Sequence, residues 1–207
     1  TKLNLSVLVG LLALLGVLGY LGLQAVWEST DRTMDERLVL ARMVAQDIDQ
    51  DISERLQQLE QFAGSMVPYL EDGRLEPVQL SLEQLYRYGG AHIRNVFVLD
   101  EQGRIIWIVP ASPDLVGKPL SFYPNVRESI DQREPAVSGA ILPPGEEGFF
   151  VSLSVPVLGQ EGDTLGVLGT ILGPASAFLQ SLLSPVDLGQ TGYAQVINER
   201  GSIMATS

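Results

Sequence analysis

The sequence contains no cysteine and only one histidine. Without cysteine there is no disulfide framework, no thiolate metal site and no thiol nucleophile, and one histidine cannot form a zinc site alone. Basic residues are also scarce, because 13 lysines and arginines face 25 aspartates and glutamates, which gives a formal net charge of −12. Nucleic acids and anionic lipid surfaces both attract basic proteins, so a nucleic-acid partner is not expected.

Motifs of the common enzyme classes are missing as well. The sequence has no G-x-S-x-G elbow, no Walker loop and no G-x-G-x-x-G fingerprint. Its acidic residues are scattered over polar stretches. We therefore expect this chain to contain no catalytic residue, no metal site and no cofactor, and an extracytoplasmic hydrolase is kept only as a third hypothesis.

The first feature that is present is a long apolar run. From Leu3 to Trp27 there is no charged residue and no histidine. As a helix this run is about 37 Å long, enough to cross a hydrocarbon core of about 30 Å. A secretory signal peptide is the alternative, but its apolar region has only about 7–15 residues and ends at a small-x-small site. This run ends in Trp27, a residue suited to the membrane interface, so residues 1–27 are predicted to be an uncleaved transmembrane anchor.

The residues that flank this run indicate its orientation. Lys2 precedes it, and a mixture dominated by acidic residues, including Glu28 and Asp31, follows it. The part of the chain after the anchor is therefore expected to be extracytoplasmic.

Residues 28–72 have the repeat of a long helix. Apolar residues recur at heptad spacing, and only Arg55 interrupts them. The two series are Leu38, Ala45, Ile52, Leu59, Met66 and Ala41, Ile48, Phe62, Tyr69. One apolar face of this length needs a partner, which could be a second copy in a parallel dimer or the protein's own sheet. We favour a mixture, with dimer contacts near the membrane and packing on the globular part farther along.

Residues 73–184 have shorter elements, which predict a module of helices and hairpin-linked strands. Helices are expected over 75–88, from Ser121 to near Arg133, and over 174–183. Strands are expected over 93–99, 104–109, 136–141, 148–157 and 164–172, with a turn at Asp100–Gly103. The fold class is therefore α+β, with a PAS-like antiparallel sheet flanked by helices.

Several blocks in this region resemble a known family. Phe97–Ile106, Leu115–Leu120, Phe122–Arg127 and Ser152–Val157 followed by Leu165–Gly169 are similar to the blocks of a Cache sensor domain. Residues 188–204 resemble the opening of the membrane-proximal module of a double Cache. The resemblance implies a membrane-distal Cache module over 73–184 and the start of a second module over 185–207, where this chain stops.

The family resemblance also suggests ligand-binding residues. Amino-acid-binding members carry an aromatic residue and an arginine five positions later, and Phe122 and Arg127 have that spacing. The Trp-Tyr pair that follows in the family is replaced by Ser129 and Ile130, and the later aspartate has no clear match. Arg127 could clamp a carboxylate, or it could be a helix-surface residue paired with Asp131. Further candidates are Trp107 and Tyr123 as pocket walls and Ser152 and Ser154 as donors on one strand face.

The resemblance implies the sensing region of a bacterial receptor in the plasma membrane. We expect a small-molecule ligand, an organic acid or amino-acid-like compound, and a homodimer. A histidine kinase of a two-component system is the favoured output, with a diguanylate cyclase or a chemoreceptor as alternatives. The competing hypothesis is an adhesion or scaffold module of the same fold that binds no ligand.

Overall fold

The computed structural model describes residues 2–90, 92–120, 123–141, 148–173, 179–180, 183, 193–197, 201 and 203–206. Its helices are α1 (Lys2–Glu71), α2 (Leu75–Tyr88), the short 3-10 helix η1 (Pro113–Leu115) and α3 (Pro124–Gln132). Its strands are β1 (Ile93–Leu99), β2 (Ile105–Val109), β3 (Ala136–Val137), β4 (Val151–Leu158), β5 (Thr164–Leu172), β6 (Gln195–Ile197) and β7 (Ile203–Thr206). The chain divides into two compact units, Thr1–Gln46 and Asp47–Ser207.

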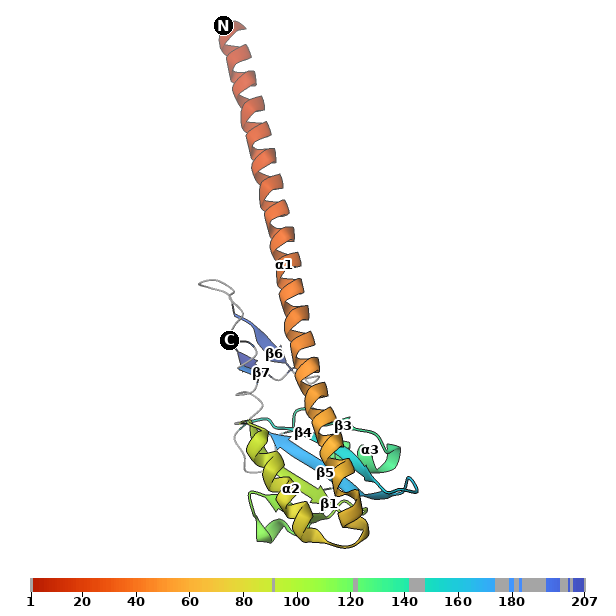
Figure 1. Ribbon diagram of the computed structural model, residues 1–207. Helices are drawn as coiled ribbons and strands as arrows, with labels where there is room; N and C mark the ends of the chain where they lie inside the picture. The colour runs from red at the N-terminus through yellow and green to blue at the C-terminus, as the bar shows by residue number, and fades with distance from the viewer. Residues whose placement is uncertain are drawn as a thin grey trace. The chain divides into compact units, whose positions relative to one another are not determined.

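Five strands form one antiparallel sheet in the order β2-β1-β5-β4-β3 (Figure 1). The β1–β2 hairpin closes where the sequence predicts its turn, because Gly103 adopts a φ of 75° that a residue with a side chain rarely adopts. The Asp100 carboxylate supports this turn by accepting hydrogen bonds from the backbone N–H groups of Gln102 and Arg104 at 3.0 and 2.8 Å. The predicted α+β class with an antiparallel sheet is confirmed.

Two helices cover one face of the sheet. From Ile52 onward, the apolar residues of α1 recur every three or four positions and pack with α2 on this face. The buried helical residues of this core are Leu59, Ala63, Met66, Val78, Leu82 and Leu85. The second half of the heptad series in α1 therefore packs on the protein's own sheet.

The opposite face of the sheet is covered by α3. Tyr123 and Val126 pack there against Phe97, Leu99 and other apolar strand residues. Pro124 occupies the first turn of α3, where its missing N–H costs nothing. The helix ends at Arg133, which has a φ of 60° and caps the last turn in the left-handed conformation.

Element boundaries differ from the predicted ones in several places. The strand expected over 136–141 is shorter, since β3 ends at Val137 and only Ile141 bridges back to Phe150. Strand β4 begins at Val151, later than expected. Ser121, the predicted helix cap, lies outside the described residues, and the residue before the helix is Tyr123. Most of the expected helix over 174–183 also lies outside them.

The helix α1 runs without interruption through residues 27 and 28, where the sequence predicts the anchor to end. Within the described part of the chain, no helix is both long enough and apolar enough to cross a membrane. The anchor over residues 1–27 therefore stays a prediction from the sequence. Strands β6 and β7 form a separate two-stranded antiparallel sheet in the region predicted to start a second module.

Candidate functional site

A group of buried polar side chains lies between α3 and the β3–β4 edge of the sheet. We call it the polar cluster, and its members are Asn125, Ser129, Ser138, Ser152 and Ser154. None of the five is more than 5% exposed. Buried polar groups lower stability unless they are hydrogen-bonded, so the partners of each member decide what the cluster can do.

Asn125 is at the centre of the polar cluster. Its Nδ2 group lies 3.0 Å from Ser154 Oγ, 3.1 Å from Ser152 Oγ and 3.2 Å from the backbone oxygen of Ser152. A carboxamide has two N–H groups, so three acceptors share two hydrogens. The donor side of this amide is therefore fully used.

The serine hydroxyls connect α3 to the strands. Ser129 Oγ lies 2.9 Å from Ser154 Oγ and 3.2 Å from the backbone oxygen of Ser154. Ser154 Oγ also reaches the backbone oxygen of Asn125 at 3.1 Å. Ser138 Oγ accepts a hydrogen bond of 2.7 Å from the backbone N–H of Ser152. These bonds fix α3 on β4 through small polar groups.

One atom of the polar cluster remains unpaired. Asn125 Oδ1 is buried and accepts no hydrogen bond from any residue that the structure describes. A buried acceptor without a donor costs about 1–3 kcal/mol relative to its state in water. The cluster therefore has an excess of acceptors over donors at this point.

Local sequence explains how these residues come together. Side chains alternate along a strand, so Ser152 and Ser154 of β4 face α3 while Leu153 and Val155 belong to the core under α1 and α2. Residues four apart on a helix share a face, so Asn125 and Ser129 both face the sheet. The prediction that the two serines share a face is confirmed.

The other predicted site residues are not gathered around these serines. Tyr123 lies on the α3 side of the sheet but packs in the apolar cluster with Phe97. Trp107 is half-buried on the opposite side, against the core under α1 and α2. Arg127 is exposed on α3, and Phe122 lies outside the described residues. Whether these residues bind a ligand stays a prediction.

The ion pair with Asp131, which was the alternative role for Arg127, is not among the ion pairs of the described residues. Those pairs join Arg55 to Asp51, Arg74 to Asp72 and Arg87 to Glu83. In the same part of the chain, no group of three or more histidine, aspartate or glutamate side chains could hold a metal ion.

Sequence reasoning did not identify Asn125 or Ser138, and it noted Ser129 only as a departure from the family pattern. One signal was available in the sequence. Asn125 and Ser129 stand four residues apart on a short helix that also carries Val126 and Ile130. A small polar pair inside an otherwise apolar helix face needs polar partners on the surface that it covers.

Comparisons with known proteins concern the fold. No protein-family model and no curated protein sequence matches the chain. Solved structures of chemoreceptor ligand-binding domains do match it. The Pseudomonas aeruginosa amino-acid chemoreceptor PctB, in complex with L-Gln, matches with a TM-score of 0.61 and 20% identity over 79% of this chain and 64% of that domain.

Two further structures give the same result. The ligand-binding domain of Pseudomonas aeruginosa PctC, in complex with GABA, has a TM-score of 0.59, 18% identity and coverage of 79% of this chain and 70% of that one. The domain of Pseudomonas fluorescens CtaA with L-isoleucine has a TM-score of 0.57, 18% identity and coverage of 79% and 64%. This chain thus spans about two thirds of the length of these domains and shares their fold.

Proposed function

We propose that this chain is the ligand-sensing region of a transmembrane receptor, with its globular part outside the cytoplasm. The observation that carries the proposal is the fold shared with ligand-binding domains of amino-acid chemoreceptors. The layout in the sequence supports it, because an apolar run, a long helix and a compact α+β module follow one another. A double Cache whose second module begins near residue 185 is the finer form of this proposal.

The proposed ligand is a small amino-acid-like metabolite. The similar domains were solved with L-Gln, GABA and L-isoleucine, and each of these compounds has an ammonium group and a carboxylate. The face of the sheet under α3 is the proposed binding region, because polar side chains are buried there between two elements. Arg127 remains the proposed partner of a carboxylate.

We keep a sensor histidine kinase as the proposed output and propose no catalytic activity for the chain itself. A methyl-accepting chemoreceptor is the second candidate, favoured by the solved structures, all three of which belong to chemoreceptors. A scaffold module without a ligand is the competing function, and the dispersed positions of Trp107, Tyr123 and Arg127 favour it.

A homodimer is part of the proposal. Leu38 of the heptad series is about half exposed, and Ala41 and Ala45 of the same series are exposed too, while α1 is packed on the sheet from Ile52 onward. The heptad series continues through both parts, so its first part has an apolar face for a second copy of α1 in parallel.

The proposed function is tested by a thermal-shift screen of amino acids and small organic acids on the full chain, in detergent, followed by calorimetry. Ligand that binds only the folded state at 100 times its Kd raises the unfolding free energy by about 2.7 kcal/mol. We expect at least one amino-acid-like compound to raise the Tm in a saturable way. If no compound in either class does so, the scaffold hypothesis replaces the sensor hypothesis.

A further inference from the structure

We propose that Asn125 is a ligand-binding residue of this chain and that its Oδ1 atom accepts a hydrogen bond from an ammonium group of the ligand. The inference rests on the proposed sensor function and adds the residue and the ligand group that it recognises. Asn125 is not one of the positions that the family resemblance suggests, so it is derived from the structure alone.

The first argument is the balance of hydrogen bonds around Asn125. Its Nδ2 group has three acceptors for two hydrogens, while Oδ1 has none among the described residues. Turning the amide over would place Oδ1 3.2 Å from the backbone oxygen of Ser152, which can only accept, so this contact favours the orientation in the structure. In this orientation Oδ1 has no donor among the described residues.

The second argument is the chemistry of the surroundings. Backbone oxygens of Asn125, Ala136, Ser152 and Ser154 all take part in bonds within the polar cluster. No member of the cluster carries a charge, and the whole chain has a net charge of −12. A carboxylate would meet oxygen atoms and long-range repulsion, whereas an ammonium group has three donors for such a set.

The third argument concerns access. Asn125 is completely buried, so a ligand reaches Oδ1 only if α3 moves away from β4. The contacts of α3 with β4 are made by serine and asparagine groups, whose hydrogen bonds a ligand or water can replace. The helix has nine residues and ends at Arg133, the one non-glycine residue with positive φ in the described part of the chain. Release of α3 from the sheet exposes one completely buried apolar residue of the helix, Val126, whereas release of α2 exposes three, Val78, Leu82 and Leu85.

The test uses three probes of matched length with the full chain. Butylamine carries only the ammonium group, butyrate carries only the carboxylate, and 4-aminobutyrate carries both. The binding of each at millimolar concentration is measured by calorimetry and by thermal shift. We expect butylamine and 4-aminobutyrate to bind the wild type and butyrate to bind much more weakly.

Two substitutions and one control locate the group. Asn125→Leu has a similar size and removes the acceptor, so it should weaken butylamine binding roughly 10- to 100-fold, as expected for a hydrogen bond to a charged group. Asn125→Asp keeps an oxygen at this position and adds negative charge, so it should bind butylamine at least as tightly as the wild type. Gln132→Leu makes the same exchange of an amide for an apolar group at an exposed position of α3 and should have no effect. Circular dichroism shows whether each variant folds. If Asn125→Leu does not fold, the comparison of Asn125→Asp with the wild type tests the proposal.

Each other outcome overturns the assignment. Equal binding of butylamine to wild type and Asn125→Leu makes Asn125 a structural residue, and binding of butyrate as tight as that of butylamine excludes ammonium recognition. If an amino acid from the screen binds the wild type and the Asn125 variants alike, the sensor function stands and only the role of Asn125 falls. If neither the screen nor the probes show binding, both fall.

Discussion

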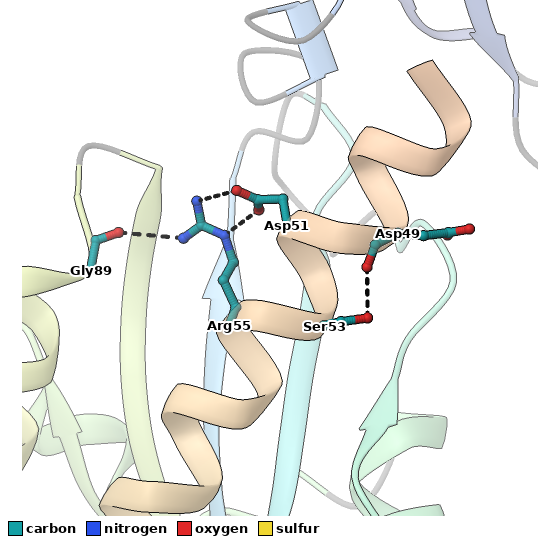
Figure 2. Close-up of polar contacts among 5 residues, drawn as sticks. All are labelled: Asp49, Asp51, Ser53, Arg55 and Gly89. Carbon is teal, nitrogen blue, oxygen red and sulfur yellow. Dashed lines mark hydrogen bonds and ion pairs between the residues drawn. The ribbon is translucent and has the colours of Figure 1, made fainter. Parts of the chain in front are cut away.

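Arg55 of α1 reaches across to the end of α2, where its Nη1 group lies 3.4 Å from the backbone oxygen of Gly89 (Figure 2). The same guanidinium pairs with Asp51 one turn earlier on α1. Gly89 is the residue that ends α2, and the last carbonyls of a helix have no partner within it. The one residue that interrupts the apolar repeat of α1 thus provides a polar link between the two helices on this face of the sheet.

Replacing Arg55 by alanine should therefore lower the unfolding free energy by about 1–2 kcal/mol, because the variant loses a hydrogen bond to a charged group and the packing of the side-chain stem. Urea unfolding followed by circular dichroism measures the change. The control is Arg87→Ala on α2, whose pair with Glu83 is more exposed, and it should change stability by less than about 0.5 kcal/mol. Equal effects of the two substitutions would show that the Gly89 contact contributes nothing.

Leu82 of α2 is completely buried in the core under α1 and α2, while Leu80 on the same helix is 58% exposed. Leu82→Ala should lower the unfolding free energy by about 2–5 kcal/mol, since it removes apolar contacts and leaves a cavity. Leu80→Ala makes the same change of side chain at the surface and should cost under about 0.5 kcal/mol. Chemical unfolding of both variants measures these changes. Similar losses of unfolding free energy in the two variants would mean that α2 does not pack on the sheet as described.

Gly166 lies on β5 where the backbone of β1 approaches closely. A Cβ atom at this position would lie 2.1 Å from the backbone oxygen of Leu99, which belongs to the paired strand and cannot move alone. Gly166→Ala should therefore lower the unfolding free energy by about 1–3 kcal/mol or more. Gly139→Ala, where a Cβ atom has no neighbour within 4 Å, is the control. A thermal melt in which both variants match the wild type would contradict the close approach.

The main elements of the fold could be predicted because local chemistry decides them. Glycine at 103 permits the hairpin turn, alternation shows that Ser152 and Ser154 share a face, and helical spacing identifies the buried face of α2. These signals depend on neighbouring residues alone, so a single sequence contains them.

The side of the sheet on which Trp107 lies could not be predicted, because β2 contains a bulge that the alternation of side chains along a strand does not reveal. Val98 pairs with Trp107 while Leu99 pairs with Ile105, so Ile106 is an extra residue in β2. Ile105 therefore joins the core under α3, while Ile106 and Trp107 both pack on the opposite side. The polar cluster was missed for a related reason, because its bonds join residues 14–29 positions apart in sequence.

The proposed dimer depends on the apolar seam of α1 before Ile52. Leu38 belongs to the heptad series, whereas its neighbour Val39 lies outside it, and the two are exposed to a similar extent at 49% and 54%. Leu38→Glu should therefore shift the full chain in detergent from dimer to monomer in analytical ultracentrifugation, because a charge in a coiled-coil seam is buried without a partner. Val39→Glu adds the same charge outside the seam and should leave the dimer intact. A wild-type chain that sediments as a monomer at all concentrations would exclude the parallel dimer.

Arg127 is the proposed partner of a ligand carboxylate, and its position on α3 gives a way to separate it from Asn125. Residues two apart on a helix are rotated by about 200° around its axis, so they lie on nearly opposite sides of it. Asn125 accordingly faces the sheet while Arg127 is exposed. Arg127 meets the carboxylate of a ligand under α3 only if its side chain folds back along the helix. An exposed pair contributes up to about 1 kcal/mol, so Arg127→Ala should weaken 4-aminobutyrate binding by no more than about fivefold. Butylamine has no carboxylate, so its binding should be unchanged.

The same substitution should barely alter the unliganded protein, because an exposed side chain without a buried contact changes stability by less than about 0.5 kcal/mol. Arg87→Ala on α2 removes an exposed arginine far from α3 in sequence and should affect neither probe. Calorimetry measures the binding of both probes to both variants. Only the affinity of Arg127→Ala for 4-aminobutyrate should differ from that of the wild type. If 4-aminobutyrate binds Arg127→Ala and the wild type with equal affinity, Arg127 is a helix-surface residue and recognition of a carboxylate by Arg127 has to be abandoned.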